Sequence, residues 1–198
     1  MKPANHWWFL LYIVVVPVRL YAQDSTKELR IPAVGWTLHI PPGTRLNPDQ
    51  LDSLIEVTKK KIKPTAINIK GMQVLFGFLD TPYNGFASAI STFDTTGFLT
   101  WDNYHKSAKK QLMRLFASLR PKMEVLDTAS AVEQFGGRTF ERFYIKTYYP
   151  ENKVTLHTYW YACPYRTYDL AINVSFSEEA VGQQFLVILR RSKFDLDN

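Results

Sequence analysis

Three side chains that could carry acid–base or metal chemistry fall close together in the sequence. Asp94, Asp102 and His105 surround the expected start of a long helix, and the last two, three residues apart, can share one helix face. Carboxylate and imidazole groups in such a cluster could build a hydrolase or a metal-dependent site. The same spacing also arises at an ordinary solvated helix start. The cluster therefore supports an envelope hydrolase or metal-dependent enzyme as an alternative hypothesis.

The chain's one cysteine, Cys163, is a second candidate for chemistry. Nucleophilic catalysis needs an activated Ser or Cys beside a base, and His157 lies near the same expected hairpin. The aromatic neighbours of the thiol favour a buried, unreactive cysteine instead. No G-x-S-x-G elbow and no glycine-rich phosphate loop occurs in the chain. We therefore expect no catalytic residues of a known pattern, no metal site and no cofactor.

A third group of residues suggests binding. Residues 139–149 and 154–162 are typical of two strands that pair around the turn at residues 150–153. If Tyr149 faces Val154, Phe143 lies opposite Trp160 on a face that must belong to the core. The other face then pairs Arg142 with Tyr161, Tyr144 with Tyr159, and Lys146 with His157.

Tyrosines mixed with cations are typical of recognition surfaces, because these side chains combine contact area with hydrogen bonds. We therefore predict that this second face is the binding surface. The alternative is that a helix covers it, with the tyrosine hydroxyls reaching the rim. The candidate binding residues are Arg142, Tyr144, Lys146, His157, Tyr159 and Tyr161.

Several strands and three helices must position these residues. Helical periodicity is found at residues 48–62 and 101–119, and a last helix is expected after Ser177, which can cap it. Strand patterns are found at residues 35–40, 72–79, 86–93, 124–128, 139–149, 154–162 and 168–174. This order predicts an α+β fold, a mostly antiparallel sheet flanked by helices in an α/β/α sandwich.

Short motifs along the chain resemble the Mog1/PsbP-like group of proteins. They are the "GWTLHIPPG" stretch at residues 35–43, the Gly-Gly-Arg turn within residues 135–142, and "RRSKFD" at residues 190–195. The group includes small exported bacterial domains of unknown role. The resemblance implies an antiparallel sheet sandwiched by helices, used for binding rather than catalysis.

The first 22 residues are typical of a cleavable signal peptide. Lys2 supplies a positive charge, an uncharged apolar stretch follows from Trp7 to Val18, and Ala22 offers a small residue before the expected cleavage at Gln23. The apolar stretch is shorter than the roughly 20 residues of a membrane-spanning helix. An uncleaved anchor is the alternative. We expect residues 1–22 as signal peptide, 23–33 as a polar arm and 34–198 as one α+β domain.

Composition narrows the class of partner. The net charge of +6 falls to about +4 without Lys2 and Arg19, and the basic residues are scattered, so no nucleic-acid partner is expected. A single cysteine allows no internal disulfide, so the core alone must hold the domain. No membrane span is expected after cleavage. The sequence thus predicts an exported, periplasmic or extracellular, non-catalytic binding or accessory domain of the cell envelope, with an envelope protein or a small ligand as its partner. It leaves the oligomeric state open, and a purely structural envelope role is a further possibility.

Overall fold

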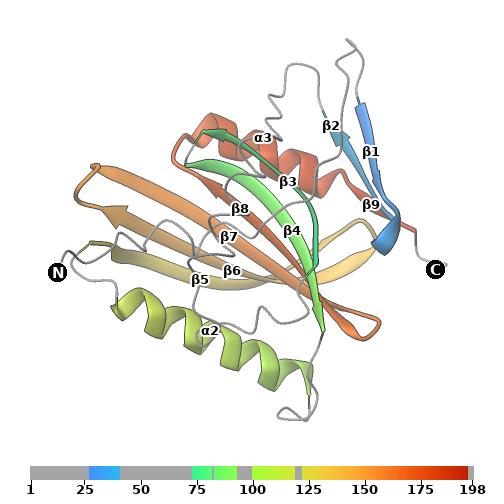
Figure 1. Ribbon diagram of the computed structural model, residues 1–198, viewed down its shortest axis with the longest axis horizontal. Coiled ribbons are helices and arrows are strands. Elements are labelled where there is room, and N and C mark those ends of the chain that lie inside the picture. Colours follow the sequence, from blue (N-terminus) through green and yellow to red (C-terminus); the bar gives the residue numbers. More distant parts are fainter. Residues whose placement is uncertain (1–26, 41–72, 82, 93–99, 119–121, 196–198) are drawn as a thin grey trace.

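A six-stranded antiparallel sheet with the strand order β3-β4-β8-β7-β6-β5 is the centre of the molecule (Figure 1). The computed structural model describes residues 27–40, 73–81, 83–92, 100–118 and 122–195. The six strands are β3 (Gln73–Thr81), β4 (Asn84–Thr92), β5 (Glu124–Phe135), β6 (Arg138–Tyr149), β7 (Val154–Tyr165) and β8 (Tyr168–Phe176). The predicted α+β class with a mostly antiparallel sheet is confirmed.

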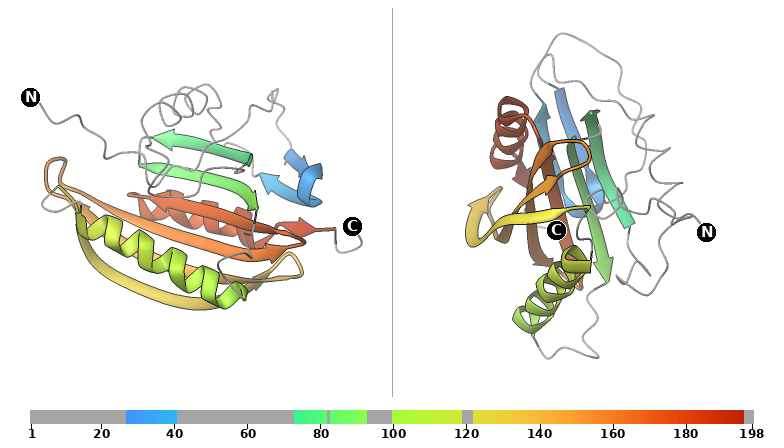
Figure 2. Two further views of the ribbon diagram at one scale, coloured as in Figure 1. Left: turned by 60° about the horizontal axis from the view of Figure 1, so that its bottom comes forward. Right: turned by 90° about the vertical axis from the view of Figure 1, so that its left-hand side faces the viewer.

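One helix covers each face of this sheet. The helix α2 (Trp101–Ser118) lies on one face and α3 (Glu179–Arg190) on the other, as the views in Figures 1 and 2 show. The core beneath α3 contains many aromatic rings, among them Phe78, Phe86, Phe140 and Phe176. The core beneath α2 is smaller and is built around Phe116, Phe143 and Ile145. Alternate residues of β6 and β7 therefore enter two different cores.

A second sheet joins residues from the two ends of the described chain. It has the order β1-β2-β9 and consists of β1 (Lys27–Ile31), β2 (Trp36–Ile40) and β9 (Lys193–Phe194), with a 3-10 turn, η1 (Pro32–Val34), between the first two. The fully buried ring of Trp36 stacks on Phe194, with ring centroids 5.2 Å apart. Part of the expected polar arm is therefore a strand, because Leu29 and Ile31 are apolar side chains that the core buries.

A tight turn connects β5 to β6. Gly136 and Gly137 both have positive φ, of 59° and 79°, between the paired residues Phe135 and Arg138. Two successive positive φ values suit the two-residue hairpin turns that match strand twist, and glycine adopts them without strain. The turn makes β5 a strand of twelve residues, much longer than the 124–128 predicted from the sequence.

Several sequence-based expectations fall on residues that the structure does not describe. The signal peptide at residues 1–22, the first residues of the arm and the helix at 48–62 all lie outside the described residues. Within the described part, no helix combines the length and the apolar character that crossing a membrane requires.

Candidate functional site

The predicted register of the β6–β7 hairpin is confirmed. Tyr149 pairs with Val154, and Phe143 with Trp160. The opposite face carries the pairs Arg142 with Tyr161, Tyr144 with Tyr159, and Lys146 with His157. All six candidate binding residues therefore lie on the sheet face that α3 partly covers, the face that the larger core occupies.

Burial separates one of the six candidates from the others. Tyr161 is completely buried and belongs to the core, so a ligand does not reach it. The remaining five, which we call the aromatic face, are half-buried: Arg142, Tyr144, Lys146, His157 and Tyr159. The helix thus covers this face only in part.

A carboxylate on the edge strand ties Arg142 and Tyr161 into the fold. Glu133 accepts hydrogen bonds from Arg142 Nη1 at 3.2 Å, Arg190 Nε at 2.6 Å and the Tyr161 hydroxyl at 3.3 Å. The hydrogen bond to Glu133 raises the pKa of Arg190, because it stabilises the charged guanidinium. The Arg142 guanidinium also lies 5.7 Å from the centre of the Tyr159 ring. Through Glu133 of β5, Arg142 of β6 and Tyr161 of β7 are linked to Arg190 of α3. Arg142 and Tyr161 therefore have a structural role.

The centre of the aromatic face is a tyrosine–histidine hydrogen bond. The Tyr144 hydroxyl and His157 Nδ1 form a hydrogen bond of 2.8 Å, and the centres of the Tyr144 and Tyr159 rings lie 4.9 Å apart. Burial raises the pKa of Tyr144, so its hydroxyl keeps its proton. Burial and the nearby Lys146 lower the pKa of His157, which favours the neutral imidazole, and the tautomer of that ring sets which of the two groups donates the hydrogen bond.

Lys146 differs from the other cations of this region. It lies opposite His157 and Asp127 in register, yet it forms no hydrogen bond or ion pair within the part of the chain that the structure describes. Arg142, by contrast, is held by Glu133. Lys146 therefore gives the aromatic face a positive charge that no described residue pairs with.

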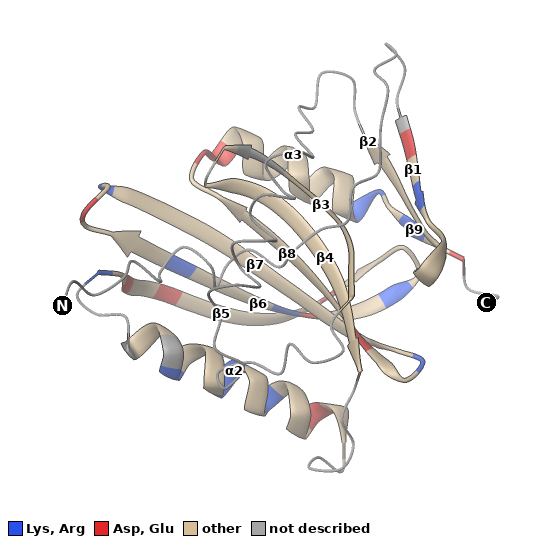
Figure 3. Ribbon diagram, viewed as in Figure 1, with Lys and Arg blue, Asp and Glu red and all other residues tan. Residues whose placement is uncertain are grey.

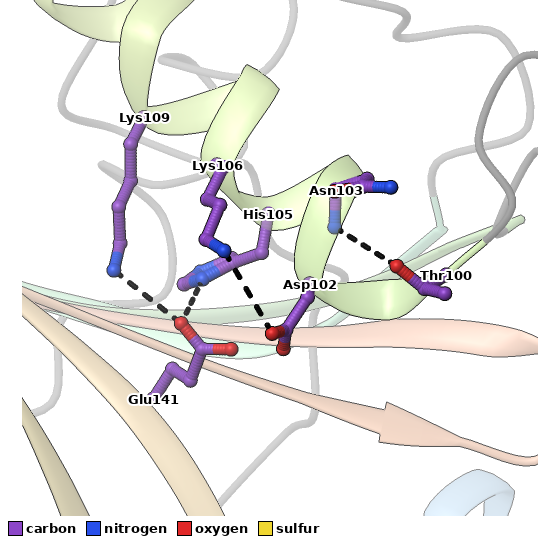
Figure 4. Close-up of polar contacts among 7 residues, drawn as sticks. All are labelled: Thr100, Asp102, Asn103, His105, Lys106, Lys109 and Glu141. Carbon is purple, nitrogen blue, oxygen red and sulfur yellow. Dashed lines mark hydrogen bonds and ion pairs between the residues drawn. The ribbon is translucent and has the colours of Figure 1, made fainter.

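The other sheet face carries a second polar group, which Figure 4 shows in close-up. His105 on α2 pairs through Nδ1 with Glu141 Oε2 on β6, and Lys109 Nζ approaches the same oxygen at 3.4 Å. The His105 ring lies between Trp101 and Trp160, at centroid distances of 5.6 Å and 4.8 Å. Only 1% of the His105 side chain is exposed.

The electrostatics of this pair favour a neutral imidazole beside a carboxylate. Burial lowers the pKa of His105, although the charge of Glu141 opposes the effect. Burial alone would raise the pKa of Glu141, but His105 and Lys109 outweigh it and hold that pKa below its usual range. His105 Nε2 is buried and has no hydrogen-bond partner among the residues that the structure describes. A neutral histidine oriented by a carboxylate is the form that acts as a general base, but here two tryptophans enclose the ring.

The structure does not bring together Asp102 and His105, on which the enzyme hypothesis was built. His105 pairs with Glu141, whereas Asp102 Oδ2 lies 3.9 Å from Lys106 Nζ on the same helix. Asp94 is outside the described residues. Among the described residues, no three or more His, Cys, Asp or Glu side chains gather as a metal site would require.

Cys163 and His157 do not form a catalytic pair. Both are on β7, and a strand rises about 3.3 Å per residue, which places them roughly 20 Å apart. Burial raises the pKa of the Cys163 thiol to about 12, so the reactive thiolate does not form at neutral pH. The expectation of a buried cysteine is confirmed.

A buried carboxylate that sequence reasoning missed lies near the start of α2. Asp169 is 4% exposed and accepts one hydrogen bond at Oδ2, from the Tyr104 hydroxyl at 3.2 Å. Within the described part of the chain its Oδ1 has no hydrogen-bond partner, and burial raises the pKa of Asp169 to about 7. The signal in the sequence was an acid in a strand of apolar residues, "YDLAINV".

Comparison with known proteins places this α+β sandwich in a fold group. No protein-family model and no curated protein matches the sequence. The solution structure of cyanobacterial PsbP (CyanoP) from Synechocystis sp. PCC 6803 superimposes with a TM-score of 0.53 at 10% identity, covering 91% of this chain and 98% of that one. The predicted Mog1/PsbP-like fold is thereby confirmed, and at this identity the likeness concerns the fold alone.

Two further solved structures are less similar. The Ran-binding protein Mog1p of Saccharomyces cerevisiae has a TM-score of 0.40 at 11% identity, covering 87% of this chain and 96% of that one. A protein of unknown function from Pseudomonas aeruginosa has a TM-score of 0.36 at 9% identity, covering 82% and 90%.

Proposed function

We propose that this protein is an exported, non-catalytic binding or accessory domain of the cell envelope, and that the aromatic face is its binding surface. The observation that carries the proposal is the uncommitted Lys146 charge beside the half-buried rings of Tyr144, Tyr159 and His157. Aromatic side chains next to a cation provide contact area, hydrogen bonds and charge within one surface.

Packing beneath the surface supports the proposal, because it holds the rings in place before any partner arrives. Phe176 is buried and stacks on His157 at 5.3 Å and on Tyr159 at 5.9 Å. The hydrogen bond between Tyr144 and His157 holds these two side chains in a fixed orientation. Side chains that are already ordered lose less conformational entropy when a partner binds.

Export is the first part of the proposal that can be tested. When the full-length chain is produced in a bacterial host, we expect the protein in the envelope or medium to begin at Gln23, because residues 1–22 have the charge and length of a signal peptide. Mass spectrometry of the isolated protein measures this directly. Val15→Arg places a charge in the apolar stretch and should retain the protein inside the cell. A mature mass that includes residues 1–22 would contradict cleavage.

Binding is the second part. We expect the mature protein, used as bait on an envelope fraction, to recover a reproducible partner, and Lys146→Glu to reduce that recovery about tenfold, the effect of roughly 1.4 kcal/mol. Lys110→Glu is the matched control, since it makes the same charge change at an exposed position of α2, on the other face of the sheet. Equal recovery by the Lys146→Glu and Lys110→Glu variants would exclude the aromatic face as the binding surface.

A further inference from the structure

The edge strand β5 is long and exposed. It lies at the edge of the six-stranded sheet (Figure 1), as the last strand in the order. It contains twelve residues, and residues 126–130 are all exposed. A strand at a sheet edge offers unpaired backbone N–H and C=O groups to any extended chain that approaches it. Natural proteins usually shorten, charge or cover such edges, so an open edge of this length needs an explanation.

The middle of β5 has few protecting features. The stretch Thr128–Val132 has no charge and no proline, and the register shift of this strand lies before it, between Val125 and Asp127. Leu126 and Val132, 51% and 67% exposed, are two of the four large hydrophobic side chains that the described residues expose. Exposed apolar groups concentrated on one strand favour its burial by a partner.

Small side chains border the aromatic face on this strand. Ala129 pairs with Tyr144, and Ala131 pairs with Arg142. Paired residues of neighbouring strands point to the same face, so the two alanines separate the sheet edge from Tyr144 without blocking it. A strand added at the edge could therefore lay large apolar side chains over the alanines and against Tyr144.

The charge of β5 decides between two classes of occupant. The strand carries Glu124, Asp127 and Glu133 and has no basic residue, as Figure 3 shows for its ribbon. Glu133 is neutralised by Arg142 and Arg190, whereas Asp127 is exposed and has no ion pair among the described residues. A second copy of β5 would bring acids near acids, and like charges across a strand pair are destabilising. A strand of another protein that carries a basic residue would instead have a charge complementary to that of Asp127.

We propose that the edge of β5 binds an extended segment of another protein as an added antiparallel strand. The segment carries large apolar residues opposite Ala131 and Ala129 and a lysine or arginine opposite Asp127, an alternating pattern that follows from the two-residue period of a strand. Strand addition of this kind obtains its affinity from main-chain hydrogen bonds and its specificity from alternate side chains. The inference rests on the proposed binding function and names the class of its partner.

Two synthetic peptides of the same length as β5 test the proposal. Both carry two aromatic residues at alternating positions, and two residues further on one has lysine and the other glutamate. We expect the lysine peptide to bind the mature protein about tenfold more tightly than the glutamate peptide, since the two place opposite and like charges beside Asp127. Binding should shift the amide resonances of residues 128–132 in NMR spectra and protect them from hydrogen exchange.

Variants of the protein provide the controls. Asp127→Lys should reverse the preference between the two peptides, whereas Asp102→Lys, at an exposed position on α2, should leave it unchanged. Failure of both peptides to bind, equal binding of the two, or resonance shifts away from β5 would overturn the proposal. Dimerisation of the free protein with protection of residues 128–132 would overturn it in favour of a second copy. If these tests fail while Lys146→Glu still reduces recovery of the envelope partner about tenfold, the strand-addition inference is wrong and the proposed binding function stands.

Discussion

Replacing Gly182 with alanine is expected to destabilise the protein by about 2 to 3 kcal/mol, although alanine is the better helix former by about 1 kcal/mol. Gly182 is buried in α3, where the helix packs directly on Phe176. A Cβ atom at this position would lie 2.3 Å from Cγ and Cδ2 of the Phe176 ring. The ring is itself buried between its neighbours, so the helix must move away from the sheet.

The effect of Gly182→Ala should extend to the aromatic face, since Phe176 stacks on His157 and Tyr159. Denaturant unfolding measures the stability, and the NMR resonances of His157 report the displacement. Gln184→Ala, on the exposed side of the same helix, is the control and should change stability little. Combining Gly182→Ala with Phe176→Leu should cost less than the sum of the single changes, because the smaller side chain relieves the overlap. An additive double variant would show that the Gly182–Phe176 contact is not the cause.

Asp169→Asn is expected to stabilise the protein at alkaline pH by up to about 4 kcal/mol, the equivalent of a pKa shift of roughly three units. Burial raises the pKa of Asp169 from 3.8 to about 7. Between these values the folded protein binds a proton that the unfolded chain has lost, so stability declines as the pH rises from about 4 to 7 and is constant above that window. Asparagine does not ionise and removes this decline.

Unfolding curves of the wild type and the Asp169→Asn variant at pH 5 and pH 8 measure the effect. The difference between the two proteins should be less than half as large at pH 5 as at pH 8, because only about one of the roughly three pKa units separates pH 5 from the unfolded value. Asp127→Asn provides a matched control, because Asp127 is exposed on β5 and should change stability little at either pH. An Asp169→Asn variant that is less stable than the wild type at both pH values would show that the ionised carboxylate is needed by the fold.

The sequence predicts the elements whose signals are local. The helix α2 follows from apolar residues spaced three and four apart, and the β6–β7 register follows from alternation around the turn at residues 150–153. The length of β5 was missed because Ala129, Ser130 and Ala131 are poor strand formers. Its pairing with β6 comes instead from the Gly136–Gly137 turn. Ser177 was expected to cap α3, but the N-cap residue is Glu178, whose side chain makes no capping hydrogen bond, and Ser177 Oγ donates to Asn84 Oδ1 instead.

The candidate site depended on contacts that are distant in sequence. The register placed Glu141 on the same face as Phe143, so a charged residue on a core face was the available sign that Glu141 needs a partner. Nothing local identified that partner as His105, which comes from another element. Tyr161 was placed on the correct face, but its burial depends on α3 and on Glu133 of the edge strand. Tertiary packing of this kind does not follow from periodicity.

The stacking of Trp36 on Phe194 has a consequence for how the chain matures on the ribosome. Strands β1 and β2 are synthesised early, but β9, which completes their sheet, is among the last described segments to emerge. Trp36 can therefore meet Phe86 early, at a ring-centroid distance of 6.1 Å, but must wait for Phe194 until β9 has been synthesised. Contacts between segments this far apart in sequence also form slowly, because the intervening chain must be closed into a loop. The three-stranded sheet of the nascent chain thus stays incomplete, and its apolar strands accessible to chaperones, until β9 has emerged.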